Sequence, residues 1–204
     1  MDWIIAVSML VIVSVVAGLA YLGYKLIKKH QTSTADLKHK AQKPLACAKG
    51  FVRGQEFRLI SPASLAKDGK FADLDFIVVG YFGVLGVKCI GLGGEIYGSA
   101  GDAMWLQVAG TQRTSFENPL LRAQSDARLV RDTLFAASLK SVPVEVVCVC
   151  TNPRAVLALP RSTGHFTNKE FAAYLKKNKF EQDKGVDIAA TAAAIEKWRM
   201  EPSA

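Results

Sequence analysis

The longest hydrophobic segment lies at the start of the chain. Residues 3–24 contain no charged side chain, and a lysine-rich stretch follows immediately. As a helix, this segment extends over about 30 Å, which is the thickness of the hydrocarbon core of a bilayer. Its only serines are Ser8 and Ser14, too few for the polar face of a soluble helix. The pattern therefore predicts a transmembrane anchor over residues 1–24.

A cleaved signal peptide is the alternative interpretation of this segment. Signal peptides begin with basic residues and end in small residues at the cleavage site. This segment begins with Met1-Asp2 and ends in bulky residues, which favours a retained anchor. Six lysines and one acid, Asp36, lie between Lys25 and Lys43. The positive-inside tendency thus predicts a single-pass protein of the inner (cytoplasmic) membrane, with the N-terminus outside and the remainder cytoplasmic.

Beyond the anchor, the pattern of apolar residues predicts three further parts. Residues 25–49 are polar and basic, which indicates a juxtamembrane linker; residues 50–160 indicate one α/β domain; residues 161–204 indicate a helical C-terminal extension. Short runs rich in β-branched residues, bounded by glycines, predict the strands of the domain. The expected strands are 74–79, 84–90, 95–97, 105–108 and 144–150.

Four helices are expected from capping residues and apolar spacing. Asn118-Pro119 opens a helix whose apolar residues recur every three or four positions, as one buried stripe. Thr167 and Glu170 have the spacing of a capping box for a helix that ends at Tyr174. Asp187 caps a last helix that reaches Trp198, and residues 56–65 predict a short helix broken near a proline.

The net charge narrows the possible partners, and the cysteines narrow the possible metal sites and the cellular compartment. The net charge is +8, and the part after the anchor carries +9 (26 basic minus 17 acidic residues). A basic domain is attracted to the anionic inner leaflet and to nucleic acid. Cys148 and Cys150 lie two residues apart and so point to one strand face, which is not metal-ligand spacing. Buried reduced thiols fit a cytosolic compartment.

The predicted hairpin carries the candidate chemistry. An acid in the first strand, a tight glycine turn and a second strand have the layout of restriction-endonuclease-like nucleases. In those nucleases two acids hold a divalent metal ion that activates water, and a lysine places a cation near the developing charge. The chain resembles the nuclease-related (NERD) domain family over roughly residues 50–160. The matching stretches are Leu74–Gly80, Gly83–Leu85, Gly94–Gly98, Trp105, Phe116 with Asn118–Leu120, and Val144–Asn152. The resemblance implies a mixed β-sheet flanked by helices.

Departures from the family pattern affect the metal site. Asp75 matches the first acid, but Lys88 stands where the family has its second acid; shifting the register by two residues puts Gly86 there instead. In the helix, the family glutamine and histidine fall on Arg122 and Asp126. The resemblance therefore implies a degenerate catalytic site of Asp75 and Lys88, and we expect the two side chains to form an ion pair. No cofactor is expected.

The expected function is binding rather than cleavage. Arg122, Gln124, Arg128 and Arg131 lie outside the apolar stripe of their helix and are candidates for binding an anionic ligand. The partner is then nucleic acid, or else a protein at the membrane face. The alternative is an active nuclease with a rearranged site, in which Mg²⁺ or Mn²⁺ is held by Asp75 together with Glu95 or Glu56.

Overall fold

The computed structural model describes residues 41–160 and 164–200. This part of the chain is mixed α/β, with parallel and antiparallel strand pairs flanked by four α-helices. The α/β class expected from the sequence is thereby confirmed. The predicted transmembrane segment lies outside the described residues. Within them, no helix combines the length and the apolar character that crossing a membrane requires.

Five strands form the central sheet. Their spatial order is β1 (Arg58–Ile60), β4 (Phe76–Gly80), β5 (Gly83–Ile90), β9 (Val144–Cys150) and β11 (His165–Thr167). β4 pairs antiparallel with β1 and β5, whereas β9 runs parallel to β5 and β11. The sheet is therefore mixed, as the sequence predicted.

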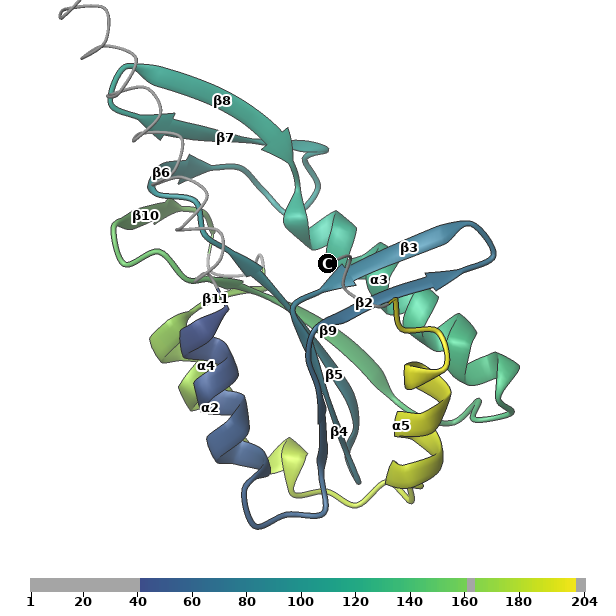
Figure 1. The fold of residues 1–204 in the computed structure, drawn as a ribbon. Coiled ribbons are helices and arrows are strands. Elements are labelled where there is room, and N and C mark those ends of the chain that lie inside the picture. The colour runs from purple at the N-terminus through teal and green to yellow at the C-terminus, as the bar shows by residue number, and fades with distance from the viewer. Residues whose placement is uncertain (1–40, 161–163, 201–204) are drawn as a thin grey trace, which may run out of the picture. The chain divides into compact units, whose positions relative to one another are not determined.

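Helices cover both faces of this sheet (Figure 1). One face carries α2 (Gln42–Val52) and α4 (Asn168–Tyr174), and the other carries α3 (Pro119–Ala136) and α5 (Ile188–Glu196). Successive side chains of a strand point to opposite faces. Accordingly Phe76 and Val78 pack with α2 and α4, while Ile77 packs with α3 and α5. An all-apolar strand such as β4 thus contributes to both cores.

A second sheet adjoins the ends of β5 and β9. Its order is β10 (Ala155–Ala158), β6 (Gly94–Tyr97), β7 (Met104–Ala109) and β8 (Gln112–Glu117). Trp105 of this sheet packs in one cluster with Ile90, Cys148 and Leu120, so the two sheets and the start of α3 share a core. A separate hairpin of β2 (Ala63–Lys67) and β3 (Lys70–Leu74) packs against α3.

Several sequence predictions are confirmed. The strand expected over 144–150 is β9, and the expected stripe of α3 is buried throughout; it consists of Leu120, Ala123, Ala127, Val130 and Leu134. Thr167 and Glu170 form the capping box of α4. Asp187 caps α5, which ends at Glu196 instead of Trp198. Local spacing was sufficient for these elements because each buries one continuous apolar face.

Two predictions from local pattern are wrong. The helix expected over residues 56–65 is replaced by β1 and β2, since Ile60 is buried by strand pairing with β4. Part of the expected linker is the helix α2, and its residue Ala48 is fully buried against the sheet. Leu45, Ala48 and Val52, spaced three and four residues apart, carried the signal for this helix.

The cysteines behave as buried apolar residues. All four are free, and Cys148 and Cys150 lie in the same cluster, which confirms that they share a strand face. Burial raises the pKa of each of these two thiols to about 12. Both are therefore protonated near neutral pH and poor nucleophiles.

Candidate functional site

Asp75 lies at the bend between β3 and β4, opposite β5. Its Oδ2 accepts a hydrogen bond from the backbone N–H of Cys89 at 2.6 Å, and its own N–H donates to the carbonyl of Val87 at 2.9 Å. β4 begins only at Phe76, so Cys89 lies beyond the pairing of β4 with β5. The carboxylate thus satisfies a backbone donor that the strand ladder does not reach.

Lys88 lies on β5 and turns toward the β2–β3 hairpin. Its Nζ forms an ion pair with the Asp73 carboxylate and donates to the Asp73 carbonyl oxygen at 2.5 Å. The side chain of Lys88 is only 17% exposed, whereas that of Asp73 is 65% exposed. The sequence predicted a pair with Asp75, but the partner that holds the ammonium here is Asp73.

Asp126 on α3 is a second acid, and its carboxyl responds to the charge of Lys88. Its side chain is fully buried on α3, and its Oδ1 lies 3.4 Å from Nε of Arg122, one helical turn earlier. The charges of Arg122 and Lys88 and a hydrogen bond from the Asp73 backbone all favour the charged form of this carboxyl. Arg122 also donates from Nη2 to the carbonyl of Phe71, at 3.1 Å. The guanidinium of Arg122 therefore binds groups of the domain itself, the Asp126 carboxylate and the Phe71 carbonyl.

We expect Asp126 to lower the stability of the folded protein as the pH rises. Burial raises the pKa of its carboxyl above the usual 3.8, and this outweighs the lowering by the charges of Arg122 and Lys88. The folded state then binds the proton more tightly than the unfolded chain. This contribution is fully present below the unfolded pKa and is lost as the pH rises through the folded pKa.

Urea unfolding of the wild type and of Asp126→Asn over that pH range measures the effect. The free energy of unfolding of the wild type minus that of the variant should fall as the pH rises. A difference that is constant over the range would contradict a raised pKa in the folded state.

The side chains at this site do not fit a divalent metal ion. Two or more oxygen ligands must converge on such an ion, and Lys88 places a cation at the position of the second acid. At the alternative position, Gly86, a side chain would require Leu74 and Val146 to shift, because a Cβ there would lie 2.9 Å from both Leu74 Cδ1 and Val146 Cγ2. Among the described residues, no group of three or more His, Cys, Asp or Glu is arranged to hold a metal.

Glu95 and Glu56, the acids considered for a rearranged site, are both exposed. Glu95 lies on β6 in the second sheet, where its Oε2 accepts a hydrogen bond from the hydroxyl of Tyr97. Glu56 lies in the turn before β1. The acid that forms an ion pair with Lys88 is Asp73.

Three of the four residues predicted to bind an anionic ligand line a groove beside α3. Its volume is about 490 Å³, and it runs between α3 and the first half of β9. Gln124, Arg128 and Arg131 are exposed on its helical side, and Arg131 Nη2 lies 3.4 Å from the carbonyl of Val144. β11 pairs with β9 only at Cys148–Cys150, so within the described chain this strand edge opens to the groove. Arg122, which turns to Asp126, is not among the lining residues.

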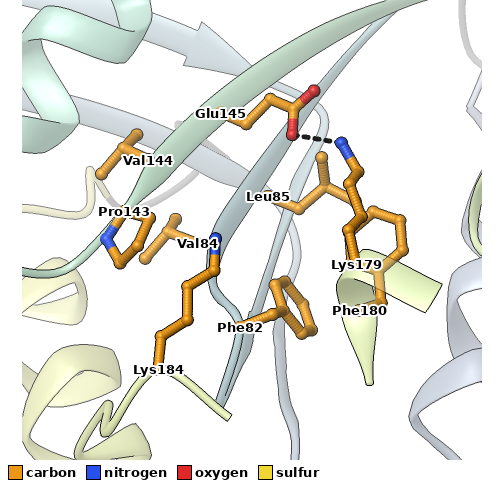
Figure 2. A pocket seen from close by; sticks show the side chains of 9 residues that line it. All are labelled: Phe82, Val84, Leu85, Pro143, Val144, Glu145, Lys179, Phe180 and Lys184. Atoms are coloured by element: carbon orange, nitrogen blue, oxygen red, sulfur yellow. Dashed lines mark hydrogen bonds and ion pairs between the residues drawn. The ribbon is translucent and has the colours of Figure 1, made fainter. Parts of the chain in front are cut away.

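Glu145 is the one acid among the residues that line the groove. Its negative charge is compensated by Lys179, on the face of the sheet that carries α4. Figure 2 shows its side chain directed to Lys179, whose Nζ lies 2.7 Å from Glu145 Oε2. Tyr174 also donates its hydroxyl to this carboxylate, and burial followed by that hydrogen bond raises the pKa of the phenol. Because Glu145 is compensated in this way, the arginines leave the groove with a positive charge.

The class of this domain follows from comparison with protein families. A family model described as "NERD: Nuclease-related domain" matches residues 37–151, which is more than half of the chain. The chain therefore belongs to the NERD nuclease-related domain family. Neither a curated protein nor a solved structure matches it.

Sequence reasoning missed Asp73. It precedes Asp75 by two residues, and only the bend at Asp75 turns β3 away from β4 and brings Asp73 to Lys88. The alternation of exposed and buried residues along β3, with Leu74 buried and Asp73 exposed, was the one available signal.

Proposed function

We propose that this protein is a single-pass, membrane-anchored NERD-domain protein that binds nucleic acid and does not cleave it. The observation that carries the proposal is the ion pair of Lys88 with Asp73 at the position of the family's second acid. A cation held there repels a metal ion and neutralises a nearby ligand. The restriction-endonuclease-like architecture is retained in this proposal, and no cofactor takes part.

The positive groove supports nucleic acid as the ligand. Arginine is well suited to phosphate because its planar guanidinium presents several donors. Arg128 and Arg131 lie one turn apart on α3 and are both exposed, and Gln124 continues the same row. Their spacing matches the (i, i+3) and (i, i+4) neighbours of a helix, so one backbone strand is able to contact all three.

The predicted anchor over residues 1–24 supports a location at the cytoplasmic face of the inner membrane. The basic residues 25–43 would then lie next to anionic lipid. Nucleic acid bound in the groove would be held close to the membrane.

The test uses the full-length chain in detergent micelles with labelled single- and double-stranded DNA and RNA. Fluorescence anisotropy should show binding whose log association constant falls linearly with log salt concentration. The same samples with Mg²⁺, Mn²⁺ or chelator should contain no shortened product on a gel.

Other outcomes would replace the proposal. Metal-dependent product that disappears in Asp75→Ala, purified in parallel, would establish a nuclease. No salt-dependent retention of any nucleic acid would leave a protein-binding domain. Cleavage that persists equally in Asp75→Ala identifies a contaminating enzyme, and repurification until it is removed restores the assay.

A further inference from the structure

We propose that the nucleic acid bound by this protein is single-stranded and crosses the open edge of β9, from the arginines on α3 to lysines on the face of the sheet that carries α4. The inference rests on the proposed function and deepens it, because it names the state of the strand and the residues that the strand meets beyond the groove. The shape of the groove, the charges beyond it and an aromatic ring at the crossing support it.

The groove beside α3 is not confined to one face of the sheet. Successive side chains of a strand point to opposite faces. Val144 and Val146 pack on the side of α3, whereas Val147 packs on the side of α4, and all three line the groove. Within the described chain, β11 pairs with β9 only from Cys148 onward. The groove therefore extends around the edge of β9, from one face of the sheet to the other.

Two smaller cavities on the α4 side join the groove at this edge. One has a volume of about 330 Å³, shares the start of β9 with the groove and is also lined by Lys179 and Lys184 (Figure 2). The other has a volume of about 310 Å³, shares Phe166 with the groove and is also lined by Lys177. A strand that passes from the arginines over the edge thus reaches a surface that carries three lysines.

Positive charge continues from the groove into these cavities. Basic residues outnumber acids among the residues that line all three: Arg128, Arg131, Lys177, Lys179 and Lys184 against Glu145 and Glu170. Lys179 is committed to the ion pair with Glu145 at the crossing. Lys177 and Lys184 are exposed, and neither forms an ion pair with another described residue. Phosphate groups therefore meet basic side chains on both sides of the edge.

Phe166 places an aromatic ring at the crossing. It is half-buried and lines both the groove and the cavity of Lys177. Its ring centroid lies 4.6 Å from that of Tyr174, which in turn lies 4.3 Å from the ammonium of Lys179. The ring is thus held in place by packing within the domain. An aromatic ring beside a positively charged groove is the arrangement by which proteins stack the bases of single strands.

A duplex does not follow this path. Double-stranded DNA is stiff, with a persistence length of about 50 nm, and the path turns from one face of the sheet to the other across a single strand edge. The bases of a duplex are also stacked on one another and are not available to Phe166. A single strand is flexible and exposes its bases, so it is able to contact both faces and the ring between them.

The experiment compares a single-stranded DNA of about 16 nucleotides with a duplex of the same length, a size at the upper end of single-strand sites. Fluorescence anisotropy measures binding of each to the full-length chain in detergent micelles. The wild type should bind the single strand about tenfold or more tightly than the duplex. Lys177→Glu/Lys184→Glu and Phe166→Leu should each weaken single-strand binding by about tenfold and change duplex binding by less than about twofold.

A matched double substitution provides the control. Lys70→Glu/Lys197→Glu makes the same change in net charge at two exposed lysines, in the β2–β3 hairpin and after α5, which line neither the groove nor the two cavities. It should leave the preference for the single strand intact. Lys177→Glu/Lys184→Glu alters exposed side chains only, and circular dichroism confirms that each variant is folded.

Two results would overturn the proposal. One is equal affinity of the wild type for the single strand and the duplex. The other is a folded Lys177→Glu/Lys184→Glu that binds the single strand as tightly as the Lys70→Glu/Lys197→Glu control. Either result, with salt-dependent retention and no cleavage by the wild type, would refute only the path across β9 and leave the proposed function standing. No retention of any nucleic acid would refute both.

Discussion

Substitution of Asn118 by alanine should lower the free energy of unfolding by about 2–3 kcal/mol, because it removes a helix cap and several buried hydrogen bonds. The side chain is fully buried, and its Oδ1 caps α3 by accepting from Leu120 N–H at 2.9 Å. Its Nδ2 donates to three carbonyls of the β6–β7 loop, those of Ser99, Ala100 and Asp102.

The loss of stability should be cooperative because Asn118 joins α3 to the second sheet. The Ser99 carbonyl also accepts a hydrogen bond from the buried Trp105 Nε1, at 2.8 Å, which connects this loop to the cluster that Trp105 forms with Ile90 and Leu120. Urea unfolding followed by tryptophan fluorescence measures the change. The Tm should fall by roughly 5–10 °C for a chain of this length.

An exposed asparagine provides the matched control. Asn178→Ala, in the short 3₁₀ turn after α4, makes the same chemical change and should alter stability by no more than about 0.5 kcal/mol. Equal effects of the two substitutions would show that the hydrogen bonds of Asn118 do not hold α3 in place.

The double substitution Arg128→Glu/Arg131→Glu should weaken nucleic-acid binding by about a hundredfold. A hydrogen bond to a charged group contributes about 1.5–3 kcal/mol, and each 1.4 kcal/mol is a factor of ten in affinity. The slope of log affinity against log salt should also become shallower by roughly one for each phosphate that an arginine no longer neutralises. Anisotropy titrations of the full-length chain at several salt concentrations measure both quantities.

Reversing the charge of an arginine outside the groove distinguishes binding in the groove from attraction by the overall charge of the protein. Arg113→Glu, on the exposed strand β8, changes the net charge in the same sense, away from the groove. It should reduce affinity far less than reversal at Arg128 alone. If Arg113→Glu and Arg128→Glu weaken binding equally, the ligand is attracted by overall charge and does not occupy the groove. Unchanged circular dichroism of each variant confirms that it is folded.

The elements that bury one continuous apolar face were predictable from sequence. The stripe of α3 and the strand β9 are examples, because a helix repeats every 3.6 residues and a buried strand needs an unbroken apolar run. The caps at Asn118, Thr167 and Asp187 were predictable for a similar reason, since each acts within three residues. α2 was missed despite its spacing, because its polar residues outweighed a narrow apolar stripe.

The strands around residue 60 were not predictable in this way. β1 exists because Ile60, Leu59 and Arg58 pair with β4, which lies far along the chain. Neighbouring residues carry little information about such a pairing, so the local pattern was mistaken for a helix. The open half of β9 likewise depends on where β11 ends, and no motif within β9 itself predicts it.

The sequence by itself determined the α/β class, the hairpin of β4 and β5, and the absence of a carboxylate at residue 88. Tertiary structure decided what these residues do. Asp75 accepts a hydrogen bond from the Cys89 backbone, and Lys88 bonds to Asp73. The reason is physical: residue type and periodicity are local, whereas the partner of a buried charge is chosen by the packing of separate elements.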